Sequence, residues 1–218
     1  MCFSASASFA VSAGTGLVGA LTITKVSRWR EVPLAAVPLI FAAQQAIEGI
    51  LWLRLANGSQ PAQLIVLANI FAICALVVWP VWSPLAASLV EPDRIRRLAI
   101  VLLLAAALPV ALLGLSGIAA HPYGVCIVGH SLSYINGTAY SSFELSAYVV
   151  CVCAPLFLSS HTILRNFGAI TATGLAVSAF FFLETSFSVW CFFAAAGSIT
   201  VYLYFADVAQ RGAKPSAA

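Results

Sequence analysis

Residues 98–117 read LAIVLLLAAALPVALLGLSG and contain no charged side chain. An α-helix rises about 1.5 Å per residue, so about 20 apolar residues cross the roughly 30 Å hydrocarbon core of a bilayer. Other largely apolar windows of similar length lie at residues 8–24, 32–53, 62–84, 142–159, 162–183 and 185–206. None of them has the alternating pattern of a barrel strand. The sequence therefore predicts an all-α integral membrane bundle of seven transmembrane helices.

The composition excludes a water-soluble globule. The chain has 218 residues, of which 62% are hydrophobic and 8% charged, whereas soluble domains average about 25% charged residues. Its formal net charge of +3 is small and does not indicate a nucleic-acid partner. We expect a single domain over residues 1–218 with the lipid bilayer as its main partner. The sequence leaves open whether the chain forms a homo-oligomer or belongs to a larger membrane complex.

The basic residues predict an orientation, because short cytoplasmic loops retain Lys and Arg during insertion. If the N-terminus is outside and the C-terminus cytoplasmic, nine of the ten basic residues fall on the inner side, and Arg54 alone falls outside. The nine are Lys25, Arg28, Arg30, Arg94, Arg96, Arg97, Arg165, Arg211 and Lys214. We therefore expect a multi-pass protein of the inner cell membrane.

Two local features break the helical pattern. Trp79-Pro80 lies inside the third predicted span, where proline removes a backbone donor and favours a bend. In the loop at residues 118–140, the stretches 123–128 and 131–135 surround Gly129-His130 and predict a small hairpin.

Several seven-helix functions lack the residues they require. A retinal Schiff base needs a lysine inside the bundle, but Lys25 and Lys214 both lie in flanking segments. Bis-histidine haem needs paired histidines within spans, whereas His121, His130 and His161 all fall at loops. The His-x-x-x-His pair of the seven-helix zinc hydrolases is also absent. We therefore expect neither retinal nor bis-histidine haem.

Glu48 is the strongest site candidate, because an ionisable group inside hydrocarbon is costly and needs a partner. It follows Gln44 and Gln45 near the outer end of the second span. Gln45, Glu48 and Trp52 share one helix face, at positions i, i+3 and i+7. The alternative is a structural role, in which these side chains hold neighbouring helices together by hydrogen bonds.

Other polar groups are expected in the same outer layer, and each has an ordinary alternative. Glu184 can be a solvated turn carboxylate, and Glu144 fits a capping box that begins at Ser141. His130 can be a solvated loop histidine, and Asn69 can serve interhelical hydrogen bonding. The ligand-binding candidates are Gln44, Gln45, Glu48, Trp52, Asn69, Ser188 and Trp190.

These residue types also permit metal chemistry. Glu48, Glu184, His130 and Glu144 offer the oxygen and nitrogen donors that suit Mn, Fe(II) or Zn. In an enzyme, Glu48 or Glu184 would ligate the metal or act as a general base. The same groups could instead hold a proton or a cationic ligand.

A disulfide between Cys2 and Cys126 is a further possibility, since both are expected on the outer side.

Four motifs support a family resemblance. They are Met1-Cys2-Phe3-Ser4-Ala5 (MCFSA), FAAQQAIEGILW at residues 41–52, Trp79-Pro80, and SVWCFFAA at residues 188–195. Together they resemble a family of uncharacterised bacterial multi-pass membrane proteins, a domain of unknown function. The resemblance implies membership and topology but no activity.

The leading interpretation is a membrane protein with an outward-facing polar pocket that binds a cation or a small polar ligand, for transport or sensing. A membrane-embedded metal-dependent enzyme that uses the same carboxylates is one alternative. An accessory subunit of a larger complex is another. The inner halves of the spans carry few polar groups, which favours a one-sided site over a transport path.

Overall fold

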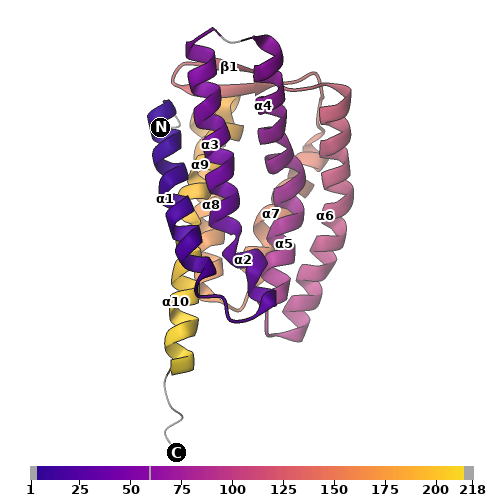
Figure 1. Cartoon of the computed structure of the whole chain (residues 1–218). Coiled ribbons are helices and arrows are strands. Elements are labelled where there is room, and N and C mark those ends of the chain that lie inside the picture. The colour runs from indigo at the N-terminus through magenta and orange to yellow at the C-terminus, as the bar shows by residue number, and fades with distance from the viewer. Residues whose placement is uncertain (1–3, 59, 214–218) are drawn as a thin grey trace, which may run out of the picture.

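The computed structural model describes residues 4–58 and 60–213, and they form a helical bundle with one small hairpin (Figure 1). The α-helices are α1 (Ala5–Ile23), α2 (Val32–Ala35), α3 (Val37–Ala56), α4 (Pro61–Ile73), α5 (Trp79–Val90), α6 (Arg94–Ala120), α7 (Ser142–Leu158), α8 (Thr162–Phe181), α9 (Ser186–Gly197) and α10 (Thr200–Ala213). Short helical turns are η1 (Trp29–Glu31), η2 (Cys74–Val78) and η3 (Leu183–Thr185), and the strands are β1 (Gly124–Val128) and β2 (Ser131–Ile135).

All seven predicted spans are helical. Six helical stretches are long and apolar enough to cross a membrane, and α7 is a shorter apolar helix of 17 residues. The prediction of a largely helical multi-pass membrane protein is therefore confirmed in outline. The orientation of the chain in a membrane stays a prediction.

Three spans are interrupted rather than continuous. The second breaks at Ala36, between α2 and α3, and the seventh breaks between α9 and α10. The third contains the π-helical turn η2 just before Pro80. Pro80 has no N–H to donate to the carbonyl of Leu76, so the regular hydrogen-bond ladder cannot continue through this point. Gly114 of α6 faces the interruption, because a Cβ added there would lie 2.9 Å from the Leu76 carbonyl oxygen.

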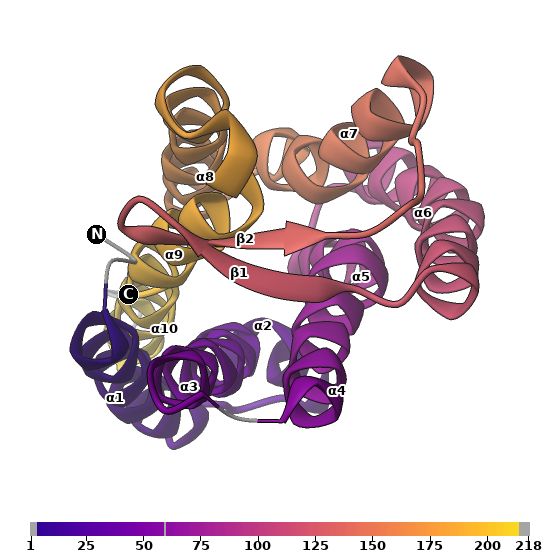
Figure 2. The same ribbon diagram turned by 90° about the horizontal axis from the view of Figure 1, so that it is seen from above.

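The predicted hairpin is present. Strands β1 and β2 pair antiparallel, with Cys126 opposite Ser133, and Gly129 at the turn has a φ of 59°. The hairpin lies across one end of the bundle, against α4 and α9 (Figure 2). Asn69 fastens it there, since its side chain accepts from the backbone N–H of Tyr123 at 3.0 Å and donates to the Tyr123 carbonyl at 3.3 Å. We call this end of the bundle the hairpin end.

The opposite end carries most of the basic residues. Helix α1 runs away from the hairpin end, and α6 and α8 begin at the opposite end (Figure 1). The connection from α1 to α2 and the first turns of α6 and α8 supply Lys25, Arg28, Arg30, Arg94, Arg96, Arg97 and Arg165. We call it the basic end. The predicted segregation of charge is thus present in the fold.

Helix α1 packs closely along α3. The Ser12 hydroxyl donates to the Ala42 carbonyl at 2.8 Å, and Gly16 lies against the Ala42 side chain. A Cβ added at Gly19 would come within 2.6 Å of Leu39, and one added at Gly49 within 2.8 Å of the Phe9 ring. Small residues therefore set the distance between the two helices, as they do in many membrane bundles.

Candidate functional site

A buried carboxylate lies between α3 and α9. Glu48 is fully buried, and both of its oxygens accept hydrogen bonds. Gln45, one turn earlier on α3, donates to Oε2 at 3.1 Å, and the Ser188 hydroxyl of α9 donates to Oε1. These partners are neutral, so they stabilise a negative charge without cancelling it.

Gln44 extends the polar cluster toward α5. Because neighbouring helical residues point about 100° apart, Gln44 faces away from Gln45 and meets other helices. Its Oε1 accepts from the indole of Trp79 at 2.8 Å, and its amide contacts the Cys191 sulfur at 3.3 Å. Gln44 is fully buried, and these contacts tie α3 to α5 and α9.

Three buried polar atoms near Glu48 have no hydrogen-bond partner among the described residues. They are Oε1 of Gln45, Nε1 of Trp52 and the hydroxyl of Ser8. Ser8 precedes Phe9, whose ring lies against Gly49, so Ser8 is at the level of Glu48. Buried polar atoms are normally paired, and leaving one unpaired costs about 1–3 kcal/mol. The cluster thus has unused capacity for hydrogen bonding.

A cavity of about 770 Å³ lies at the hairpin end of this cluster. Ser4, the N-cap of α1, and Ala7 of α1 line it together with residues 128–131 and 181–185. His130 and Glu184 are both in its wall, so two of the predicted outer groups do share one cavity. The buried Ser8 follows Ala7 on α1, and Ser188 lies one helical turn beyond Glu184. We call this cavity the vestibule.

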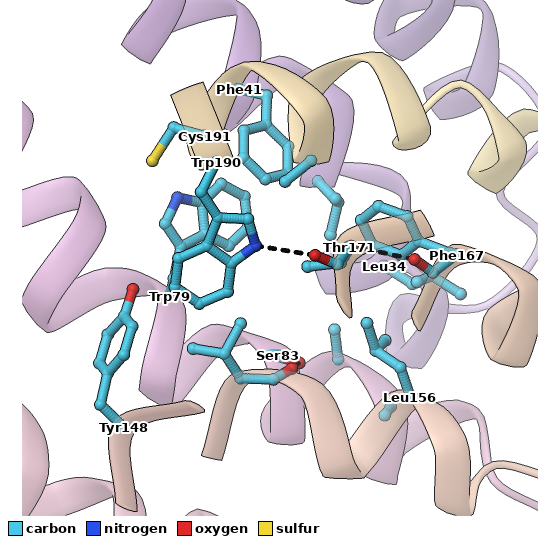
Figure 3. Close-up of a pocket in the computed structure, with 15 residues that line it drawn as sticks. Leu34, Phe41, Trp79, Ser83, Tyr148, Leu156, Phe167, Thr171, Trp190 and Cys191 are labelled. Carbon is cyan, nitrogen blue, oxygen red and sulfur yellow. Dashed lines mark hydrogen bonds between the residues drawn. The ribbon is translucent and has the colours of Figure 1, made fainter. Parts of the chain in front are cut away.

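Toward the basic end the cluster is closed by apolar packing. A small cavity of about 40 Å³ lies on this side of the cluster. Its lining is mainly apolar, as Figure 3 shows. Trp79 and Cys191 form part of its wall and also contact Gln44. The indole of Trp190 donates across the cavity wall to the Thr171 carbonyl at 2.9 Å.

The structure brings some of the predicted site residues together and separates others. Gln45, Glu48 and Ser188 form one hydrogen-bonded group, and Gln44 adjoins it. Asn69 instead holds the hairpin through Tyr123. Trp190 directs its N–H to Thr171 rather than to Glu48.

The expected four-ligand metal shell is not assembled. Glu48 is buried between α3 and α9, whereas Glu184 and His130 line the vestibule. Glu144 serves the capping box of α7, where its Oε2 accepts from the Ser141 N–H at 2.6 Å and from the Ser141 hydroxyl at 2.8 Å. Within residues 4–58 and 60–213, no three His, Cys, Asp or Glu side chains are placed to hold a metal ion. This corrects the expectation of one shared metal shell, because the four candidate ligands lie in different places.

Cys2 lies outside the described residues, so its pairing with Cys126 stays a prediction.

Sequence reasoning missed a second buried carboxylate, at the basic end. Glu91 is 2% exposed and accepts from the Ser159 hydroxyl at 3.0 Å, the Ser160 N–H at 2.8 Å and the Ser160 hydroxyl. It joins the turn after α5 to the turn after α7. Both turns follow helices that run toward the same end of the bundle. This shared direction could have indicated from the sequence that Glu91 lies near Ser159 and Ser160.

Burial by itself would raise the pKa of Glu91, but the hydrogen bonds from Ser160, Ser159 and the Asp93 N–H outweigh it and hold the pKa below its ordinary value. Glu91 is therefore a charged structural anchor near neutral pH. In the sequence, Pro92 and Asp93 follow Glu91 in a pattern that is typical of an exposed turn, so the sequence alone does not indicate a buried carboxylate.

The apolar helices and the internally satisfied backbone define a multi-pass helical membrane protein. The chain belongs to a family of unknown function, DUF6629, which it matches over residues 1–217. No curated protein matches the chain. No solved structure matches it either.

Proposed function

We propose that this protein binds a small polar ligand with a cationic or hydrogen-bond-donating group at the Glu48 cluster, from the outer face of the inner membrane. The observation that carries the proposal is a fully buried carboxylate whose hydrogen-bond partners, Gln45 and Ser188, are both neutral. A positive or donating group would complement its charge. Oε1 of Gln45, which accepts from no side chain or backbone group that the structure describes, offers a second acceptor beside it.

The vestibule supplies the approach. It lies at the hairpin end, which is the outer end if the basic end faces the cytoplasm. Glu184 in its wall favours cations over anions at the entrance. From the wall of the vestibule, the buried polar side chains of Ser8 on α1 and Ser188 on α9 lie toward Glu48.

The closed floor favours recognition over passage. Below Gln44 the cavity walls are mainly apolar, with Ser83, Thr171 and Tyr148 as their polar members. Among the described residues, the next buried charged group is Glu91, at the other end of the bundle. A ligand held at Glu48 therefore has one polar route, which fits a sensing role better than a transport path.

A ligand-protection experiment tests this proposal. The full chain is purified in mild detergent, and its thermal unfolding is followed in the chloride salts of ammonium, methylammonium, guanidinium and choline, with sodium chloride at equal ionic strength as reference. We expect at least one organic cation to raise the unfolding midpoint of the wild type but not of Glu48→Gln. Asp93→Asn, which removes a carboxylate at the basic end, is the matched control and should retain the response. Equal responses in wild type and Glu48→Gln, or no response in the wild type, would overturn the proposal.

A further inference from the structure

A third cavity lies between α6, α7 and α9, and Tyr148 and Trp190 separate it from the small cavity below Gln44. Its volume is about 540 Å³, within the range of about 300–1,000 Å³ that is typical of small-molecule sites. Leu113 of α6 and Leu145 of α7 line it and are 46% and 53% exposed, so it opens on the lateral surface of the bundle. We call it the lateral groove.

The groove is apolar along the helices and polar at the hairpin end. Ala106, Pro109 and Val110 of α6 and Leu175 of α8 line the part that is farther from the hairpin end. Helix α6 runs toward the hairpin end, whereas α7 and α9 begin there (Figure 1). The wall residues from the first turns of these two helices and from the loop before α7 therefore lie at the hairpin end of the groove, and they are Tyr140, Phe143, Glu144, Leu145, Ser186 and Phe187.

This arrangement matches an amphiphile held in its normal orientation in the bilayer. The distance along α6 from Ala106 to Leu113 is about 10 Å, at about 1.5 Å per residue, which gives room for a segment of one hydrocarbon chain. The polar end of the groove is where the headgroup of that lipid would lie. A bilayer offers such chains at very high local concentration.

The charge of the polar end selects the headgroup. Among the described residues that line the groove, Glu144 is the one charged side chain, so an anionic headgroup is disfavoured. Both capping contacts of Glu144 reach Oε2, which leaves Oε1 outside the capping box. A primary ammonium group could donate to this oxygen, whereas a quaternary ammonium has no N–H to donate.

Ser186, at the start of α9, supplies a complementary donor at the same end of the groove. A serine hydroxyl can donate to a phosphate oxygen. Tyr140 also lines the groove, but its hydroxyl is buried beside Gly117 and is closed to a bound lipid. An acid, a hydroxyl donor and an apolar channel thus meet in one groove.

We propose that the lateral groove binds one acyl chain of phosphatidylethanolamine, with the ammonium group of the lipid on Glu144 and its phosphate on Ser186. This is a lipid site that does not depend on the ligand proposed for Glu48.

Lipid retention tests the assignment. The full chain is reconstituted in vesicles of equimolar phosphatidylethanolamine, phosphatidylcholine and phosphatidylglycerol with identical acyl chains. It is then extracted in mild detergent, and the retained lipids are quantified by mass spectrometry. We expect severalfold enrichment of phosphatidylethanolamine over the other two lipids in the wild type.

Two sets of variants separate the groove from its headgroup contact. Ala106→Trp fills the groove and should remove the retained lipid, while Ala105→Trp, at a neighbouring exposed alanine that does not line the groove, should keep it. Glu144→Gln preserves a capping side chain and should retain lipid but lose the preference for phosphatidylethanolamine over phosphatidylcholine. Equal lipid recovery from the two tryptophan variants, an unchanged preference in Glu144→Gln, or enrichment of phosphatidylglycerol in the wild type would overturn the proposal.

Discussion

The Ser188 hydroxyl donates to the carboxylate of Glu48, and the two residues are 140 positions apart in the chain. This contact joins the second predicted span to the seventh. Because Gln45 donates to the other oxygen of the same carboxylate, Glu48 organises both α3 and α9 at the hairpin end. Loss of the Glu48 carboxylate should therefore lower the stability of the protein as well as its affinity for a ligand.

Glu48→Ala should lower the free energy of unfolding by about 1–3 kcal/mol, since it removes the hydrogen bonds that the buried carboxylate accepts from Gln45 and Ser188. Glu48→Gln keeps an amide oxygen at the position and should lose less. Reversible unfolding in mixed detergent micelles measures both values. Equal stability of Glu48→Ala and wild type would mean that the carboxylate does not hold these helices together.

Gly19→Ala should destabilise the α1–α3 contact, because the added Cβ would meet the Leu39 side chain at 2.6 Å and its backbone nitrogen at 3.0 Å. We expect a loss of about 1–3 kcal/mol, as for other overpacked contacts. Gly14→Ala on the same helix is the control, since an added Cβ there meets nothing within 4 Å. The two variants are compared by thermal unfolding in detergent, and a Gly14→Ala loss as large as that of Gly19→Ala would contradict the packing account.

Glu91 should make stability depend on acid. Its folded-state pKa lies below the ordinary value of 4.5, so its contribution is complete above pH 4.5 and is lost as the pH falls through the folded-state pKa. Glu91→Gln should be less stable than wild type at pH 7, and the difference should shrink below pH 4.5. Unfolding midpoints of both proteins between pH 3 and pH 7, about the range over which carboxylates titrate, measure that difference. A constant difference across this range would show that Glu91 is not ionised in the fold.

Much of the helical layout could be predicted because hydrophobic length is a local property of the chain. The predicted spans, the hairpin around Gly129 and the interruption before Pro80 all follow from such local signals. The break between α9 and α10 was not predicted, since the apolar pattern of residues 185–206 continues through it.

The candidate site was harder to predict, because helix rotation and neighbour order are not encoded in span length. The shared face of Gln45 and Glu48 could be read from their spacing, and their hydrogen bond confirms that the two side chains meet. The expectation that Glu184 and His130 lie in the same outer layer agrees with their positions, since both line the vestibule. It could not show that Glu144 faces a different groove or that Asn69 holds the hairpin. Those outcomes depend on which helices are neighbours.

Ser8→Ala provides a test that separates a binding role from a structural one. The Ser8 hydroxyl is buried without a partner among the described residues, so its removal should leave the empty protein equally stable or raise its unfolding free energy by up to about 1–3 kcal/mol. Ser12→Ala, one turn along α1, removes a hydrogen bond to the Ala42 carbonyl and should instead destabilise. If the hydroxyl serves a ligand at the Glu48 cluster, Ser8→Ala should also weaken the thermal protection by the organic cation that protects the wild type. Unfolding of both variants with and without that cation measures the two effects, and a Ser8→Ala protein that is destabilised like Ser12→Ala would assign Ser8 to helix packing alone.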